Sequence, residues 1–328
     1  MQRDSFYDNA RVGLIFLVVF GHLLQPYTGL TTGLQTLYTW IYTFHMPAFI
    51  LISGFFAKGS TEPKYIYNLI KKLLIPYILF QLIYTGYYYL IDKPNYQKDL
   101  FDPQWSLWFL LSLFSWHLLL ILFKKLPAYL SISIAITIGL LVGYVDDVGK
   151  AYSLSRTFAF FPFFLVGYFL SKKQLNQLQK PAIRTLSMGI MVTIAVLIYL
   201  VPDFNSGWLL ASKSYSHLGL PTSGAFARFL VYFTSSLMVM SFLSWVPSRK
   251  FSFTYIGERT LYVYLLHGFV IQFIRQTDLL SISHPIQIFG ILVLAVVLVY
   301  LLSHQLIVSL FKPIIELKLN IKGKRNTA

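Results

Sequence analysis

The chain has 328 residues, of which 56% are hydrophobic and only 12% are charged, and its formal net charge is +15 at pH 7. Soluble domains carry about 25% charged residues, so this composition predicts a membrane protein. The basic residues form small clusters between apolar runs rather than a continuous stripe, which argues against nucleic acid as a partner.

Ten apolar runs, each long enough for a transmembrane helix, follow one another along the chain. Their approximate bounds are 10–28, 37–57, 73–91, 105–123, 128–145, 154–171, 184–201, 224–244, 255–274 and 285–306. We therefore expect an all-α, polytopic integral membrane protein with about ten transmembrane helices. No internal repeat or soluble segment is evident. Residues 1–328 are expected to form a single transmembrane domain that lies in the cell membrane, in contact with its lipids.

The connectors between these runs alternate in charge. Those after the second, fourth, sixth and eighth runs, together with the two ends of the chain and Arg259 at the start of the ninth run, carry twenty of the 27 lysines and arginines. The opposite side carries five. Because cytoplasmic loops are enriched in Lys and Arg, this asymmetry predicts that the N- and C-termini are both cytoplasmic.

The first run contains ionisable residues at a helical spacing. Arg11 and His22 are eleven residues apart, about 20° more than three full turns, so both side chains lie on one face of a helix. The rise between them is roughly 16 Å, about half the hydrocarbon thickness. Asp8 precedes Arg11 by three residues and can pair with it. Ionisable groups in a membrane helix usually face a protein interior or a wet cavity, so this helix is expected to line a polar channel.

Other histidines also lie within apolar runs. The predicted topology puts His22 in the outer half of its helix, with His45 and His267 at a similar depth. A single intramembrane histidine commonly ties two helices together, and we favour this interpretation for His45, His117 and His267 taken singly. For His22 we favour a functional role, because Arg11 shares its face.

Cationic and aromatic side chains near the membrane boundaries are further candidates. Arg156, Arg228 and Trp108 enter near the outer ends of their runs. Both arginines suit an acceptor or an oxyanion, and the alternative is that they only snorkel to the outer headgroups. Lys71 and Lys72 precede the third run. Adjacent ammonium groups suit a phosphate-bearing donor, although an ordinary positive-inside anchor has the same pattern.

Several kinds of site are excluded or unsupported. The chain has no cysteine, which excludes disulfides, a thiol nucleophile and a thiolate metal site. It contains neither a P-loop nor the zinc-binding H-E-x-x-H motif. No acidic residue accompanies the histidines at ligand spacing, so we expect no metal site and no tightly bound cofactor.

Six motifs are spread over the first nine runs. They are Asp8-Asn9-Ala10-Arg11 with ten residues before His22, Phe44-His45-Met46-Pro47-Ala48-Phe49 leading to Ser53-Gly54-Phe55-Phe56, Lys71-Lys72-Leu73-Leu74-Ile75-Pro76, Leu107-Trp108-Phe109-Leu110, Phe161-Pro162-Phe163-Phe164-Leu165-Val166-Gly167-Tyr168, and Thr260-Leu261-Tyr262-Val263-Tyr264-Leu265-Leu266-His267. Their sequence and order resemble the membrane acyltransferase family 3, in particular its fucose 4-O-acetylase-like branch. Ten spans with cytoplasmic termini are also typical of that family.

The resemblance implies a transferase that moves an acyl group, usually acetyl, from cytosolic acyl-CoA to a hydroxyl of a glycan. It implies that His22 and Arg11, with Asp8 beside them, form the essential catalytic pair, and that Arg11, Lys71 and Lys72 bind the acyl-CoA. Many relatives have arginines in place of the two lysines, and lysine lacks their bidentate fork. The expected co-substrate is acetyl-CoA, and the expected acceptor is a cell-surface polysaccharide or a lipid-linked glycan.

In this interpretation His22 acts as the general base on the acceptor hydroxyl, and an acyl-histidine intermediate is the rival mechanism. Residues expected on the acceptor or oxyanion side are Arg156, Arg228, His45, Trp108 and His267. Two alternative functions stay open. One is transfer of succinyl or another acyl group, and the other is a transporter or flippase whose solute path follows the same polar wall.

Overall fold

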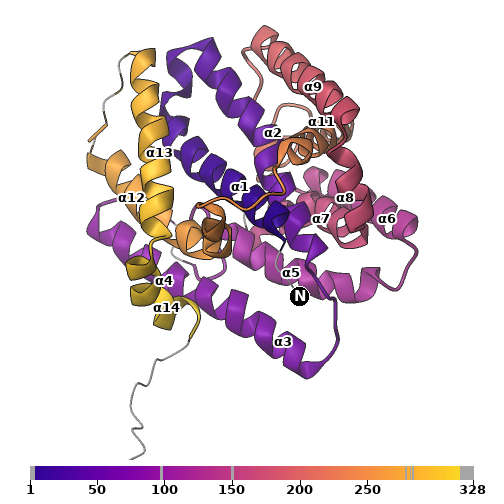
Figure 1. Cartoon of the computed structure of the whole chain (residues 1–328), viewed down its shortest axis with the longest axis horizontal. Helices are drawn as coiled ribbons and strands as arrows, with labels where there is room; N and C mark the ends of the chain where they lie inside the picture. Colours follow the sequence, from indigo (N-terminus) through magenta and orange to yellow (C-terminus); the bar gives the residue numbers. More distant parts are fainter. Residues whose placement is uncertain are drawn as a thin grey trace, which may run out of the picture.

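The computed structural model describes residues 4–96, 99–148, 151–277, 279–280, 282 and 284–317, and every regular element within these ranges is a helix. The helices are α1 Ser5–Leu24, α2 Thr32–Phe55, α3 Pro63–Leu69, α4 Ile75–Leu90, α5 Trp108–Phe123, α6 Ala128–Leu141, α7 Leu154–Phe169, α8 Lys172–Leu178, α9 Pro181–Leu200, α10 Gly207–Leu210, α11 Gly224–Trp245, α12 Thr260–Thr277, α13 Ile288–Leu302 and α14 Gln305–Ile315. Figure 1 shows them gathered around α1 and α2, which pack against each other. The all-α expectation is confirmed for this part of the chain.

Each of the ten predicted apolar runs overlaps a helix, but fewer helices have the dimensions of a membrane span. Among the described residues, four stretches are long and apolar enough to cross a membrane: Ser5–Leu30, Pro63–Leu90, Pro181–Leu200 and Gly224–Trp245. Two bent helix pairs, α7 with α8 and α13 with α14, raise this number to six at most. The other predicted runs do not meet this criterion for two reasons. Helices α5 and α6 have only 16 and 14 residues, and helices α2 and α12 contain polar side chains.

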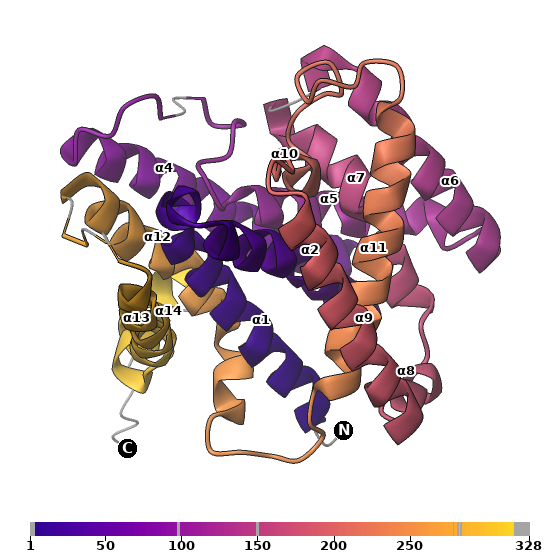
Figure 2. The ribbon, with the colours of Figure 1, turned by 90° about the horizontal axis from the view of Figure 1, so that it is seen from above.

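The two ends of the molecule are built from different connections. Figure 2 shows the start of α1, helix α8 and the α11–α12 connection at one end, and the α4–α5 connection and α10 at the other. Lys172, Lys173, Arg249 and Lys250 belong to segments at the first end. The structure therefore separates the segments that the alternation of charge separates in the sequence. Of the counted cations, Arg3, Lys98, Lys150 and those from position 318 onward lie outside the described residues.

Helices α2 and α7 approach so closely that their crossing requires glycine on both sides. A side chain on Gly54 would overlap the Phe164 carbonyl, and one on Gly167 would overlap the Leu51 carbonyl. Small residues let helix backbones touch, which matters in a bilayer because the surrounding lipid is as apolar as the helices. This crossing anchors α2, the helix that carries His45.

The start of α1 is fastened by a buried asparagine. The Asn9 amide donates to the carbonyl oxygens of Pro247 and Arg249, at 2.8 Å in each case. Its own oxygen accepts a hydrogen bond of 2.7 Å from the Thr254 hydroxyl. Because Asn9 is buried, these bonds are sheltered from water and fix the position of the neighbouring residue Asp8.

Candidate functional site

Three of the predicted histidines meet near the end of α1. The rings of His22 and His267, on α1 and α12, are stacked with centroids 5.6 Å apart. Tyr42 of α2 joins them to His45, because its hydroxyl lies 3.4 Å from Nδ1 of His22 and its ring 4.5 Å from that of His45. His117 stands apart from this group, hydrogen-bonded to a tyrosine hydroxyl.

Two of these rings are oriented by their own helices. Nδ1 of His45 lies 2.9 Å from the Ile41 carbonyl oxygen, and Nδ1 of His267 lies 3.0 Å from the Val263 carbonyl oxygen. Since a carbonyl oxygen only accepts, each Nδ1 carries a proton and each Nε2 of the neutral ring is an acceptor. Nε2 of His267 is buried without a hydrogen-bond partner among the described residues. In that same part of the chain no three His, Cys, Asp or Glu side chains are grouped to hold a metal ion.

Trp105 packs against this group in a strained backbone conformation. Its ring centroid lies 4.3 Å from that of His22 and 5.4 Å from that of His267. Its φ of 35° lies in the left-handed region, where a non-glycine residue costs on the order of 1–3 kcal/mol. Backbone strain of this kind is frequent at functional sites, so the conformation of Trp105 supports a functional site around His22.

Arg275, near the end of α12, holds the end of α1. Its Nη2 donates to the His22 carbonyl oxygen and, at 3.0 Å, to Oε1 of Gln25. Its guanidinium carbon lies 5.5 Å from the centroid of the Trp105 ring. The last carbonyls of a helix lack partners within the helix, and a cation there is favoured by the helix dipole. Arg275 therefore links α12 to α1 at His22.

A cavity of about 140 Å³, the histidine cavity, lies beside His22 and is also bordered by His45, Trp105, Trp108 and Arg156. It shares the last three of these residues with a second pocket. His22 and Trp108 also border a space of only about 20 Å³, the narrow space. Residues 15 and 18, which precede His22 on α1, line this narrow space as well. His22 thus borders both a larger and a smaller space.

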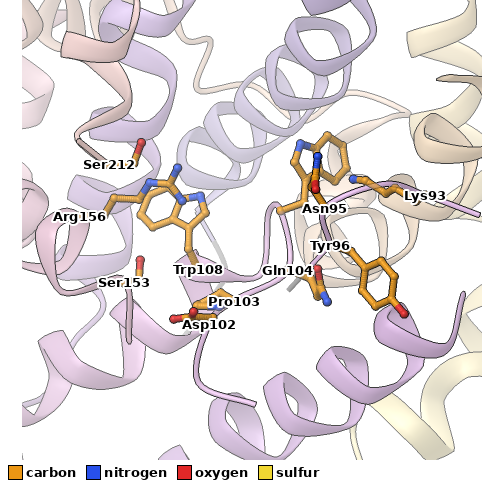
Figure 3. Close-up of a pocket in the computed structure, with 11 residues that line it drawn as sticks. Lys93, Asn95, Tyr96, Asp102, Pro103, Gln104, Trp108, Ser153, Arg156 and Ser212 are labelled. Carbon is orange, nitrogen blue, oxygen red and sulfur yellow. The ribbon is translucent and has the colours of Figure 1, made fainter. Parts of the chain in front are cut away.

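The second pocket, the loop-side pocket, has a volume of about 250 Å³ and is lined by charged, polar and aromatic side chains. Figure 3 shows Arg156 beside the Trp108 ring on one side, with Asp102 below that ring, and Lys93 on the other side. Burial lowers the pKa of the Lys93 ammonium, and the positive charge of Arg275 lowers it further. The pocket is formed mainly by the α4–α5 connection and the start of α7, at the end of the molecule that holds α10.

The two candidate arginines have different surroundings. The Arg156 guanidinium lies 4.9 Å from the Trp108 ring centroid, and its Nε donates to the Leu210 carbonyl oxygen at 3.2 Å. Arg156 lines both the histidine cavity and the loop-side pocket. Nη1 of Arg228 donates to the Trp208 carbonyl oxygen at 2.6 Å, and Arg228 does not line either of these spaces. Of these two arginines, the structure brings only Arg156 to the histidine cavity.

At the other end of α1, Arg11 and Asp8 form the pair that their spacing predicts. Nη1 of Arg11 lies 3.4 Å from Oδ1 of Asp8, and the guanidinium lies 4.7 Å from the Phe56 ring centroid. The Arg11 side chain is 23% exposed and that of Asp8 only 5%. Arg11 thus remains partly open to solvent, whereas the carboxylate beside it is covered.

Lys71 and Lys72 lie in a π-helical turn, Ile70–Leu74, that joins α3 to α4. The Ile75 amide donates to the carbonyl oxygen five residues earlier, and Pro76 follows with no amide hydrogen for the ordinary ladder. Lys72 is exposed and Lys71 half-buried. Neither lines the histidine cavity, and π turns of this kind are frequent at functional sites.

Two residues of this site, Tyr42 and Arg275, do not stand out in the sequence patterns. A signal for Tyr42 was present, because Tyr38, Tyr42 and His45 recur at i, i+4 and i+7, which is one face of a helix. Arg275 has no such signal, since a cation at the end of an apolar run looks like an ordinary loop residue. Only the packing of α12 against α1 reveals its contact.

Comparison with known proteins identifies the kind of enzyme. No solved structure matches the chain. The chain is 27% identical over 310 residues to Nodulation protein NolL of Sinorhizobium fredii, in an alignment that covers 85% of this chain and 80% of that protein. The family described as an acyltransferase domain matches residues 4–304, which include all helices from α1 to α13. The chain therefore belongs to this acyltransferase family.

Proposed function

We propose that this protein is an integral protein of the cell membrane, with ten spans and cytoplasmic termini, that transfers an acetyl group from cytosolic acetyl-CoA to a hydroxyl of a cell-surface or lipid-linked glycan. The observation that carries the proposal is the position of His22 between the histidine cavity and the narrow space. In the proposal, the two substrates meet at this one imidazole. Membership of the acyltransferase family supports the class of reaction.

His22 acts as the general base in this proposal. Its Nδ1 faces the Tyr42 hydroxyl, which leaves Nε2 for the acceptor. As Nε2 takes the proton of the acceptor hydroxyl, the hydroxyl oxygen attacks the thioester carbonyl and forms the new C–O bond. The tetrahedral intermediate then breaks its C–S bond, and the leaving thiolate takes the proton back from Nε2. A base of this kind contributes about 10²–10⁴-fold to the rate.

Arg156 stabilises the negative charge on the carbonyl oxygen during this step. It borders both the histidine cavity and the loop-side pocket, so it reaches the place where donor and acceptor meet. Excluded water strengthens such a contact. The loop-side pocket receives the acceptor, since its aromatic rings suit the apolar faces of a sugar and Lys93 and Asp102 suit its hydroxyls.

The donor approaches from the opposite end of α1. Its charged nucleotide stays at the basic end of the molecule, where Arg11, beside Asp8, and the exposed Lys72 with Lys71 provide positive charge. Its thin acyl-bearing arm enters along residues 15 and 18, where the narrow space has a volume of only about 20 Å³ and must widen by side-chain movement to admit it. The positive charge at this end of α1 supports acyl-CoA, with its phosphates, as the donor.

The test is to incubate the purified protein in lipid nanodiscs with radiolabelled acetyl-CoA and candidate glycans. We expect transfer by the wild type and at least a hundredfold loss in His22→Ala. The matched control is His117→Ala, which removes an imidazole outside the site and should transfer normally. Equal transfer by wild type and His22→Ala would overturn the role of His22.

The same preparation distinguishes the remaining alternatives. Labelled succinyl-CoA in place of acetyl-CoA reports the preferred acyl group. Acid quenching on the millisecond scale, followed by digestion, reports whether label is attached to His22, as an acyl-histidine mechanism requires. The same protein can also be reconstituted into liposomes. Movement of a solute across the liposome membrane without any acyl transfer would instead identify a transporter.

A further inference from the structure

The largest of the described cavities lies outside the site discussed so far. It has a volume of about 520 Å³, within the range of roughly 300–1,000 Å³ that is usual for ligand pockets. Its walls come from α2, α9 and α11, and α10 closes one end. We call it the lateral groove, and nothing in the proposed reaction at His22 uses it.

The lateral groove opens on a surface that we expect to face lipid. Helices α9 and α11 are two of the four that are long and apolar enough to cross a membrane, and only 6% of the apolar window of α9 is buried. Leu197, Val201 and Leu230 line the groove and are 56%, 56% and 47% exposed. Exposed aliphatic side chains around a cavity in such a helix favour a hydrocarbon chain as the occupant.

Two polar features limit which lipid fits. Thr39 lines the groove, is only 1% exposed, and its hydroxyl has no hydrogen-bond partner among the described residues. Burying a hydroxyl without a hydrogen-bond partner costs free energy. The carbonyl oxygen of an acyl chain could accept the missing hydrogen bond from Thr39. At the end near α10 the groove is bordered by Asp203 and Asn205, a carboxylate and an amide. A carboxylate repels a phosphate headgroup, whereas sugar hydroxyls can donate to it.

A single turn of helix separates the lateral groove from the histidine cavity. Leu209 of α10 lines both spaces. Two contacts of Trp208 fix this turn. Arg228 donates to the Trp208 carbonyl oxygen, and the Trp208 ring stacks on that of Tyr215 with the ring centroids 5.6 Å apart. Arg228 thus supports the partition between the two spaces. A molecule with its chain in the groove would have its headgroup close to the entrance of the reaction cavity.

We propose that the lateral groove binds the acyl chain of a glycolipid acceptor whose sugar is attached without a phosphate. This inference rests on the proposed function and names its acceptor class: an amphiphile held by its chain while a sugar hydroxyl is presented to His22. The chain supplies binding free energy remote from the reacting atoms, which orients the sugar for transfer.

The experiment uses the full chain in phosphatidylcholine nanodiscs, free of glycoside detergents that would compete. The probe is a dodecanoyl ester of glucose with a terminal diazirine, compared with the same chain on glycerol phosphate. After illumination, we expect the glucose ester to label peptides within 194–201 and 227–234 at least fivefold more than the phosphate probe does. Equal labelling by both probes, or labelling spread evenly over other exposed helices, would identify ordinary lipid contact and overturn the proposal.

Variants sharpen the assignment. Ala227→Phe places a ring in the groove and should lower labelling at least fivefold, and Leu197→Trp provides a second filled variant at a side chain that is already exposed. The control is Val196→Phe, which adds bulk at a lipid-exposed position of α9 that does not line the groove. Thermal unfolding of each variant shows that it is folded. Unchanged labelling in both filled variants would contradict the proposal.

Two further arms separate this proposal from the reaction itself. Thr39→Val should reduce labelling by the ester probe and leave that by an ether-linked glucose probe unchanged, because only the ester has a carbonyl. His22→Ala should retain full labelling, since the groove does not contain His22. Selective labelling without any acyl transfer by the wild type would refute the proposed function alone, and transfer without selective labelling would refute the groove alone.

Discussion

The two ends of α1 differ in what surrounds their ionisable side chains. His22 is enclosed by rings from three other segments, with Tyr42, Trp105 and His267 in contact and Arg275 on its carbonyl oxygen. Arg11 has an acidic neighbour one turn away and one aromatic ring, and it stays 23% exposed. One end is closely packed around an imidazole, and the other is charged and partly exposed; in the proposed function they are the reaction cavity and the donor entrance.

Under the proposed function, this contrast allows one helix to serve two substrates. A charged nucleotide keeps its hydration at an accessible arginine, whereas proton transfer is favoured where water is excluded and donors are held in place. Substitutions at the two ends should therefore change different kinetic constants. Three predictions test that separation, beginning with the largest effect, and a fourth concerns the stability of the charged end.

Removal of the imidazole should stop chemistry and spare donor binding. His22→Ala is expected to lower kcat for acetyl transfer at least a hundredfold, because the general base is lost. Coenzyme A binding, measured by calorimetry in nanodiscs, should stay within twofold of the wild type. If coenzyme A no longer bound to His22→Ala, the two ends would not be separable.

Removal of the Arg11 guanidinium should weaken donor binding and largely spare the chemical step. Arg11→Ala is expected to raise KM for acetyl-CoA about tenfold with a smaller change in kcat, because a charge-assisted contact to phosphate contributes about 1.5 kcal/mol or more. Arg11→Lys should recover part of the loss. Lys173→Ala, which removes an exposed cation at the same end, is the control, and an equal rise in KM there would indicate only a diffuse electrostatic effect.

Arg275 should act on the reaction cavity through position alone. Arg275→Gln is expected to lower kcat about fivefold, equivalent to about 1 kcal/mol for the lost hydrogen bonds to α1. KM for acetyl-CoA should not change, since the donor enters at the opposite end. Arg275→Lys, which keeps one donor, should lie between the two. A change in KM with constant kcat would place Arg275 on the donor side instead.

The smallest effect concerns the stability of the charged end. Asp4 caps α1 by accepting from the Phe6 amide at 3.1 Å and pairs with Lys172 at 2.6 Å. The hydrogen bond to Lys172 holds the pKa of Asp4 below its usual value of 3.8, against the effect of burial. A carboxyl with a depressed pKa stabilises the fold above its unfolded pKa, and this contribution is lost as the pH falls through the folded value.

Asp4→Ala is therefore expected to cost about 1 kcal/mol at pH 7 through loss of the cap, and less at pH 3. Asp4→Asn keeps a capping side chain and should be closer to the wild type at pH 7. Thermal unfolding in nanodiscs at the two pH values provides the measurement. A deficit of Asp4→Ala that is equal at pH 3 and pH 7 would show that the charge of Asp4 is irrelevant.

Local periodicity was enough to predict most of the helices and part of the site. The pairing of Asp8 with Arg11 follows from a three-residue separation, because residues one turn apart are neighbours on any helix. The meeting of His22 with His267 follows from the expected depth of each in its helix. Such inferences succeed where the relevant distance lies along a helix axis.

Contacts between helices could not be predicted in this way. Arg228 and Arg156 look alike in the sequence, yet one supports α10 and the other lines the histidine cavity. The position of Arg275 on the His22 carbonyl depends on how α12 is rotated against α1. The lateral groove likewise exists only because α2, α9 and α11 leave a space between them.

The amino-acid sequence by itself determined the all-α fold, the acyltransferase family and the shared face of Arg11 and His22, because these depend on composition, motifs and the pitch of a helix. The tertiary structure alone decided which side chains surround His22 and which space opens beside it. Those features depend on close packing between helices, such as the backbone contact at Gly54 and Gly167, which leaves no periodic trace in the chain.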